Sequence, residues 1–169
     1  MAIRIRKGNK RIMNKVLTIN EAVKLAQKLR KQNKTIVVVG GFFDILHNGH
    51  IKFLENSKKH GDYLFVLLED DNKAREVKGT NRPSNSQKDR ARILSTLESV
   101  DYIILLKNMK NNVKYDRLIT QMRPSVIATT YGDLYIKHKK RQAKLINGKV
   151  ICVIRRIHNH STTQLTKHI

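Results

Sequence analysis

The sequence is poor in cysteine, aromatic residues and long apolar runs. A single cysteine, Cys152, excludes an internal disulfide framework and is typical of a reducing compartment, so a cytoplasmic location is expected. Tryptophan is absent and aromatic residues make up 5% of the chain, which leaves little material for stacking on single-stranded nucleic acid. No run of 18 apolar residues occurs, so no membrane contact is expected. No zinc-type spacing of cysteine and histidine occurs either, and no metal-ligating residue is predicted.

Acidic residues are also scarce, since 13 Asp and Glu stand against 35 Lys and Arg, a formal net charge of +22. Such a charge is typical of proteins that bind nucleic acids or anionic surfaces. The basic residues are spread along the whole chain, however, and no helix-turn-helix, zinc-finger or ribonucleoprotein signature accompanies them. We therefore expect no specific nucleic-acid partner, and the charge is compatible with collecting phosphorylated substrates.

Apolar periodicity predicts a regular alternation of strands and helices. Residues 1–17 are read as a basic extension and residues 18–169 as one domain. The predicted strands cover residues 35–40, 63–68, 100–106, 125–128 and 149–154, and the helices about 19–31, 51–59, 87–97, 113–121 and 137–146, with a short C-terminal helix opened by Ser161-Thr162-Thr163. Residues 72–88 are predicted to be a polar loop that covers phosphates. This order favours an α/β fold with a Rossmann-like, doubly wound, five-stranded parallel sheet and an N-terminal helical extension.

The stretch from Gly41 to His50 links the first predicted strand to a helix. A glycine turn between a strand and a helix start is where α/β proteins hold phosphates, because the first N–H groups of the helix are unpaired and its dipole is positive there. His47 and His50, three residues apart, lie on nearly the same helix face. Gly49 has no Cβ, so a nucleotide can approach the backbone. Two such histidines can also be plain surface or helix-cap residues.

Other phosphate-binding signatures are missing. The dinucleotide fingerprint G-x-G-x-x-G and the P-loop G-x-x-x-x-G-K-[ST] do not occur, so the sequence gives no support to a dehydrogenase or a kinase. Three acidic residues follow the second predicted strand. Asp71 is interpreted as part of a solvated turn, whereas Glu69 and Asp70 stand where ligands gather in open α/β sheets and could serve either purpose.

The segment Gly41-Phe42-Phe43-Asp44-Ile45-Leu46-His47-Asn48-Gly49-His50 resembles the HxGH motif of the nucleotidyltransferase superfamily, in its cytidylyltransferase-like branch. Over about residues 17–169 the chain is similar to heptose-phosphate adenylyltransferases. Glycerol-3-phosphate cytidylyltransferases are similar too, including the run Gly49-His50-Ile51-Lys52. The shared motifs downstream are Gly61-Asp62-Tyr63-Leu64, Lys78-Gly79, Arg82-Pro83, Asn85, Asp89-Arg90, Val100-Asp101 and Ser161-Thr162-Thr163.

The resemblance implies a transfer of a nucleoside monophosphate to a phosphorylated small molecule with release of pyrophosphate. The leading hypothesis is AMP from ATP to a sugar phosphate; the alternatives are CTP with glycerol-3-phosphate or a similar polyol phosphate, and a basic anion- or nucleic-acid-binding protein without catalysis. The triphosphate implies Mg²⁺ that keeps waters, and the family implies a homodimer. The implied catalytic residues are His47, His50 and Lys78. The implied nucleotide-binding residues are Gly41, Phe42, Phe43, His47, Gly49, His50, Arg90, Asp133, Arg156, Ser161, Thr162 and Thr163.

Alternatives stay open for two of these assignments, and three positions depart from the family pattern. Arg90 could instead form an ion pair on a helix surface, and Ser161-Thr162-Thr163 could be an ordinary helix cap. Phe42 stands where the family usually has a small Thr or Cys. The heptose group carries Lys-Gly-Gly-Asp after its fourth strand, whereas residues 129–133 read Thr-Thr-Tyr-Gly-Asp and lack the lysine. Of the cytidylyltransferase segment Arg-Thr-Glu-Gly-Ile, only Arg156 matches.

Overall fold

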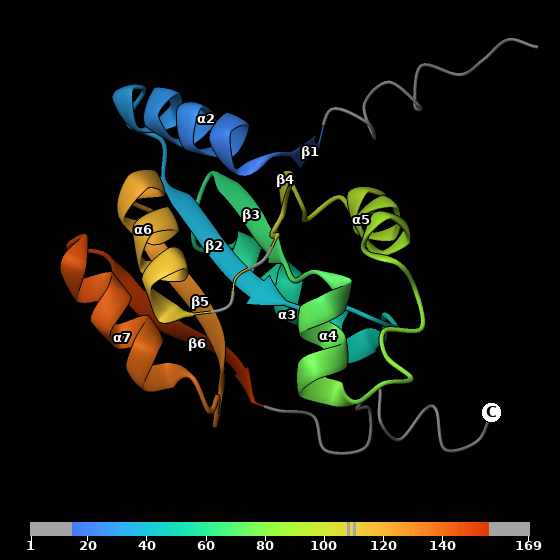
Figure 1. The fold of residues 1–169 in the computed structure, drawn as a ribbon. Coiled ribbons are helices and arrows are strands. Elements are labelled where there is room, and N and C mark those ends of the chain that lie inside the picture. Colours follow the sequence, from blue (N-terminus) through green and yellow to red (C-terminus); the bar gives the residue numbers. More distant parts are fainter. Residues whose placement is uncertain (1–14, 108, 110, 156–169) are drawn as a thin grey trace, which may run out of the picture.

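A computed structural model describes residues 15–107, 109 and 111–155 of the chain (Figure 1). Within these described residues, six parallel strands form one sheet in the order β1-β4-β3-β2-β5-β6. The predicted C-terminal helix and the candidate residues Arg156, Ser161, Thr162 and Thr163 lie outside the described residues. The elements are β1 (Val16–Leu17), α2 (Ile19–Lys31), β2 (Ile36–Gly41), α3 (Asn48–Lys58), β3 (Tyr63–Leu68), α4 (Asp71–Lys78), α5 (Gln87–Ser95), β4 (Tyr102–Leu105), α6 (Asn112–Met122), β5 (Val126–Tyr131), α7 (Ile136–Leu145) and β6 (Lys149–Arg155).

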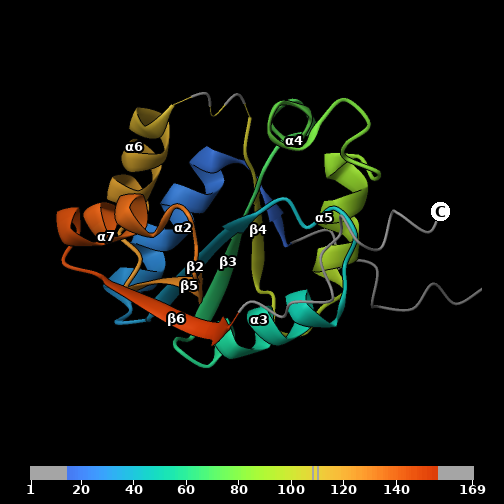
Figure 2. The same cartoon turned by 90° about the horizontal axis from the view of Figure 1, so that it is seen from below.

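The central strand β2 shows why the sheet is buried on both faces. Ile36 and Val38 belong to one apolar cluster, whereas Val37 and Val39 belong to a second cluster on the opposite face. The first cluster contains residues of α2, α6 and α7, and the second contains residues of α3 and α5. Figures 1 and 2 show these two sets of helices on opposite sides of the sheet. The doubly wound α/β architecture expected from the sequence is therefore confirmed.

The strand count and one loop were predicted wrongly. Val16 and Leu17, within the predicted extension, pair with Ile103 and Ile104 and add a sixth strand at the edge of the sheet. The predicted loop over residues 72–88 begins with the helix α4, whose buried face consists of Ala74. Asp71 opens this helix instead of lying in a solvated turn.

The chain reverses its direction of travel across the sheet at β2. From β2 it moves outward to β3 and β4, and it then returns to place β5 on the other side of β2. The connection after β2 leads toward β3 on one side of the sheet's centre, and the connection after β5 leads toward β6 on the other side. A crevice therefore forms between them, at the carboxyl ends of β2 and β5. None of the described helices is long and apolar enough to cross a membrane.

Candidate active site

The turn after β2 is held in a strained conformation that fixes the first part of the motif. Phe43 has a φ of +46°, in the left-handed region, which costs on the order of 1–2 kcal/mol for a residue other than glycine. Its ring is 5% exposed and packs in the cluster between the sheet and α3. A Cβ on Gly41 would stand 2.9 Å from this ring, so glycine is needed there for close packing. The Phe43 ring centroid lies 5.2 Å from that of His50, so the turn also supports the histidine.

His47 and His50 come together as a stacked pair at the start of α3. Their ring centroids are 3.8 Å apart and the rings are inclined by 27°. His47 is the N-cap residue, with extended backbone angles, and its side chain makes no capping hydrogen bond. The first turn of α3 contains no acidic residue. The helix start therefore presents backbone N–H groups and two imidazoles. The alternative in which the His47 side chain caps the helix is wrong, because that side chain makes no capping hydrogen bond.

His50 is held in its neutral form at pH 7. Burial lowers the pKa of His50 from 6.5 to about 4, the nearby His47 and Lys78 lower it further, and the Ile45 carbonyl opposes the shift. Among the described residues none hydrogen-bonds to the buried Nδ1 of His50. A neutral imidazole carries one N–H and can donate it to an anionic oxygen. An arriving polyphosphate would raise the pKa of His50 again.

Lys78 approaches the site from the end of α4. Its Nζ lies 4.8 Å from the centroid of the Phe42 ring, a cation–π contact. Partial burial of the ammonium lowers the pKa of Lys78, while the Asp44 carboxylate raises it. The bulky Phe42, which stands where the family usually has a small residue, therefore holds a candidate catalytic lysine beside the motif.

Asp44 ties the motif to the segment that follows α4, a role that the sequence analysis missed. The side chain is 2% exposed. It accepts hydrogen bonds from the backbone N–H of Ser84 at 2.7 Å and of Asn85 at 3.2 Å, and it forms an ion pair with Arg82 at 2.9 Å. The Asn85 amide in turn donates to the backbone carbonyl of Asp44 at 3.0 Å. The histidine motif and residues 82–85 thus form one connected unit.

Arg90 is buried beneath the turn after β2 and does not lie on the surface of the helix α5. The side chain is fully buried, and its guanidinium donates to the backbone carbonyls of Phe42, Glu69 and Asn85. It also forms an ion pair with Asp71 at 2.7 Å. The surface ion pair considered as the alternative is therefore wrong. A direct phosphate contact from Arg90 stays a prediction, and in this conformation its donors hold the turn after β2.

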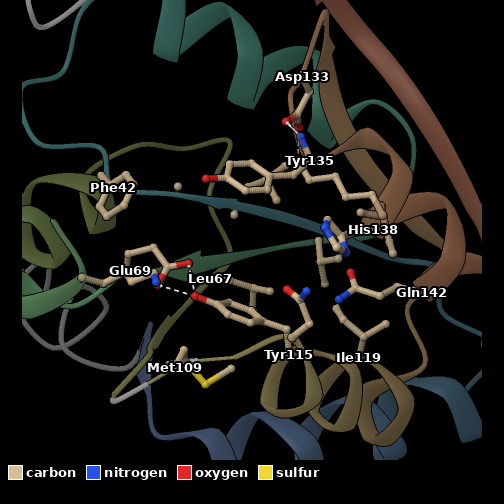
Figure 3. Close-up of a pocket in the computed structure, with 18 of the residues that line it drawn as sticks. Phe42, Leu67, Glu69, Met109, Tyr115, Ile119, Asp133, Tyr135, His138 and Gln142 are labelled. Carbon is tan, nitrogen blue, oxygen red and sulfur yellow. Dashed lines mark hydrogen bonds and ion pairs between the residues drawn. The ribbon is translucent and has the colours of Figure 1, made fainter. Parts of the chain in front are cut away.

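A cavity of about 400 Å³ opens at the carboxyl ends of β2, β3 and β5 (Figure 3). Gly41 and Phe42 line it, so the cavity adjoins the turn that leads to the histidine pair. The remaining walls come from the ends of β3 and β5 and from α4, α6 and α7. Their polar members are Glu69, Lys73, Asn111, Asn112, Tyr115, Asp133, Tyr135, His138, Lys139 and Gln142.

Asp133 lies in the cavity wall with its charge compensated. Its carboxylate accepts hydrogen bonds from Thr129 Oγ1, from Lys139 Nζ at 2.6 Å and from the backbone N–H of Tyr135 at 2.8 Å. Burial raises the pKa of Asp133, but these hydrogen bonds and the charge of Lys139 together lower it below its ordinary value. Lys139 also donates to Thr129 Oγ1 at 2.8 Å. The ammonium of Lys139 therefore lies at the end of the strand where the lysine of the heptose group is missing.

No group of three or more His, Cys, Asp or Glu side chains that could hold a metal ion occurs in the described part of the chain. Mg²⁺ stays a prediction, as an ion that accompanies the triphosphate. Gly49 lies at the second position of α3, between the two histidines, and its predicted contact with the nucleotide also stays a prediction.

Comparisons with known proteins identify the family of the chain. The Cytidylyltransferase-like family model matches residues 38–168. The bifunctional protein HldE of Aliarcobacter butzleri is 36% identical over 158 residues, which cover 91% of this chain and 31% of that protein. HldE of Pseudomonas fluorescens is 32% identical over 156 residues, which cover 91% and 32% respectively. The chain thus spans about a third of the length of these relatives.

Solved structures show the same fold. The lipopolysaccharide core biosynthesis protein from Thermoplasma volcanium has a TM-score of 0.58 at 29% identity, covering 75% of this chain and 99% of that one. Pantoate-beta-alanine ligase from Francisella tularensis has a TM-score of 0.64 at 18% identity, covering 91% and 72%, a likeness that shows the fold alone. Since the family model extends over most of the chain and includes the whole histidine motif, the chain belongs to the cytidylyltransferase-like family of nucleotidyltransferases.

Proposed function

We propose that this chain transfers AMP from ATP to the phosphate of a small sugar phosphate and releases pyrophosphate. The observation that carries the proposal is the stacked pair of His47 and His50 at the uncapped start of α3, next to the cavity at the end of β2. The resemblance to heptose-phosphate adenylyltransferases and the similarity to HldE proteins support ATP and a sugar phosphate as the substrates. The alternative pair, CTP and a polyol phosphate, has the same chemistry.

The reaction needs positioning and charge stabilisation more than proton transfer. An oxygen of the acceptor phosphate attacks the α-phosphorus in line, a new P–O bond forms, and the bond from the α-phosphorus to the bridging oxygen of pyrophosphate breaks. Negative charge grows on the α-phosphoryl oxygens and on the leaving group. In this proposal the N–H groups of the first residues of α3, the neutral His50 and the ammonium of Lys78 stabilise that charge.

The cavity provides a separate place for the acceptor. Its volume of about 400 Å³ suits a small ligand, and polar side chains surround it. Because Gly41 and Phe42 belong both to the cavity wall and to the turn before α3, an acceptor in the cavity would place its phosphate near a nucleotide bound at the helix start. Phe42 then separates the two subsites, and Lys78 lies over its ring.

Pyrophosphate release, measured across a panel of nucleoside triphosphates and phosphorylated acceptors, tests the proposal. We expect release with ATP and a sugar phosphate. His47→Ala and His50→Ala should each lower turnover roughly 100- to 1000-fold, the usual effect of losing a donor to transition-state charge. His60→Ala, at an exposed position just after α3, is the matched control and should keep normal turnover.

Three outcomes would contradict parts of the proposal. Activity with CTP and a polyol phosphate alone would establish the alternative substrates, and no release with any pair would favour the non-catalytic binding protein. Normal turnover of His50→Ala would remove the histidine from the mechanism. Mg²⁺ dependence, a homodimer and a cytoplasmic location stay predictions from the sequence, each open to a direct measurement.

A further inference from the structure

Glu69 is fixed at the base of the cavity by its backbone and by one neighbouring side chain. It follows β3, its N–H donates to the Gly41 carbonyl at 3.1 Å, and its own carbonyl accepts from Arg90 at 2.9 Å. The Tyr115 hydroxyl, on α6, lies 2.8 and 2.9 Å from the two carboxylate oxygens. Figure 3 shows the two side chains pointing toward one another along the cavity wall. The carboxylate therefore has a defined position.

The hydrogen-bonding capacity of this carboxylate is only partly used. A carboxylate offers about four lone-pair sites, whereas one tyrosine supplies a single hydrogen. In the described part of the chain no Lys, Arg or His nitrogen lies within ion-pair distance of Glu69. Burial raises the pKa of Glu69 and Asp70 raises it further, whereas the hydrogen bond from Tyr115 and the charges of Lys73 and Arg90 lower it. Asp133, across the same cavity, is by contrast fully engaged with Thr129, Lys139 and the Tyr135 backbone.

A partly desolvated acceptor that faces a cavity favours a ligand that brings donors. Two lysines, Lys73 and Lys139, line the cavity together with the two acids Glu69 and Asp133, so the formal charges balance. A cationic ligand therefore gains no net attraction there, and a second anionic group would lie close to the Glu69 carboxylate, which has no ion pair within 4 Å in the described part of the chain. Hydroxyl groups meet the requirement without adding charge.

We propose that Glu69, held in place by Tyr115, is a specificity-determining residue that accepts hydrogen bonds from hydroxyl groups on the body of the acceptor. The site then selects a polyhydroxylated monophosphate and rejects an acceptor that carries an additional acidic group. This inference rests on the proposed function for the identity of the cavity as the acceptor site. It assigns Glu69 to ligand binding and Tyr115 to positioning.

Binding of defined sugar phosphates to the full chain tests this assignment. The probes are a hexose 1-phosphate, its monodeoxy analogues, the matching hexuronic acid 1-phosphate and an amino-sugar 1-phosphate, with dissociation constants measured by calorimetry. For the wild-type chain we expect at least one deoxy analogue to bind about tenfold to a hundredfold more weakly than the parent sugar, since a hydrogen bond to a charged group is lost. The uronic acid should also bind more weakly than the parent.

The variants assign that preference to a residue. Glu69→Gln should reduce the discrimination between the parent and that deoxy analogue to a few-fold, and Tyr115→Phe should reduce it in part because the carboxylate loses its anchor. Glu98→Gln removes one negative charge at an exposed position outside the cavity and should keep the wild-type ratio. A merely structural role for Glu69 would weaken the binding of every sugar equally and leave the ratios unchanged.

Several results would overturn the inference. These are an unchanged ratio in Glu69→Gln, equal binding of the uronic acid, tighter binding of the amino sugar, or no binding of any sugar phosphate to the wild-type chain. Failure of the proposed function is distinguishable, because it appears as a lack of pyrophosphate release while the Glu69-dependent preference for the hydroxylated sugar persists. Conversely, pyrophosphate release with no effect of Glu69→Gln on the acceptor KM refutes the specificity assignment alone.

Discussion

Replacing His50 by glutamine should remove a pH dependence of stability that the wild-type chain shows. The pKa of His50 is about 4 in the folded chain and 6.5 for the unperturbed side chain. Because the folded pKa is the lower one, the unfolded chain binds the proton first as the pH falls. The contribution of His50 to the free energy of unfolding is therefore fully present above about pH 6.5. It is lost progressively as the pH falls toward 4.

The magnitude follows from the size of the shift. A change from 6.5 to about 4, at about 1.4 kcal/mol for each pH unit, corresponds to roughly 3 kcal/mol. Since the side chain is half-buried and not fully enclosed, we expect about 2–3 kcal/mol. That is a large part of the 5–15 kcal/mol that typically separates the folded from the unfolded state of a domain.

Urea denaturation followed by far-ultraviolet circular dichroism measures this difference. Between about pH 7.5 and about pH 4.5, most of the expected change should appear as a larger loss of unfolding free energy in the wild type than in His50→Gln. The exposed His60→Gln serves as the control and should follow the wild type. Equal losses in the wild type and His50→Gln would refute the placement of a neutral, desolvated imidazole at the start of α3.

Further predictions concern packing, the buried arginine, the covering segment and the net charge. Gly41→Ala should cost about 1–3 kcal/mol of unfolding free energy in urea, because its Cβ would stand 2.9 Å from the Phe43 ring; an unchanged midpoint would contradict the packing of the turn. Arg90→Gln should cost about 3–5 kcal/mol because it leaves buried acceptors unpaired, whereas the exposed Arg92→Gln on the same helix should cost less than about 0.5 kcal/mol. Amide exchange in residues 72–85 should slow when triphosphate binds, and equal protection in both states would exclude a covering role. Affinity for DNA or RNA should be weak, independent of sequence and steeply reduced by salt in a titration, so tight sequence-selective binding would overturn this view of the charge.

Most of the fold follows from apolar periodicity, and the exceptions have physical reasons. The central strands are runs of β-branched and aliphatic residues, so their pattern is strong. The strand Val16–Leu17 has two residues, too few to show any period, and its pairing with Ile103 and Ile104 is a tertiary contact. The helix α4 contains eight residues with one buried alanine, so it has no apolar stripe to reveal it.

In the candidate site, too, local features could be predicted from the sequence, whereas features that depend on tertiary contacts could not. The spacing of three positions predicted that His47 and His50 lie close together, and their rings do stack. They do not share a helix face, however, because His47 is the extended N-cap residue and only His50 lies within α3. The burial of Arg90 could not be read from the sequence, since its carbonyl partners come from three separate segments. The pairing of Glu69 with Tyr115 joins residues 46 positions apart, so it depends on the way α6 packs across the sheet.

The buried carboxylate of Asp44 has a consequence for how sequences of this kind can diverge. It accepts from two backbone N–H groups and from one guanidinium, all supplied by residues 82–85. A substitution at Asp44 would leave those donors unsatisfied, and a change of Arg82 would leave the carboxylate without its counter-ion. We therefore expect the two segments, separated by about 40 positions, to covary among homologues: where Asp44 is replaced, the residues at 82–85 should change as well.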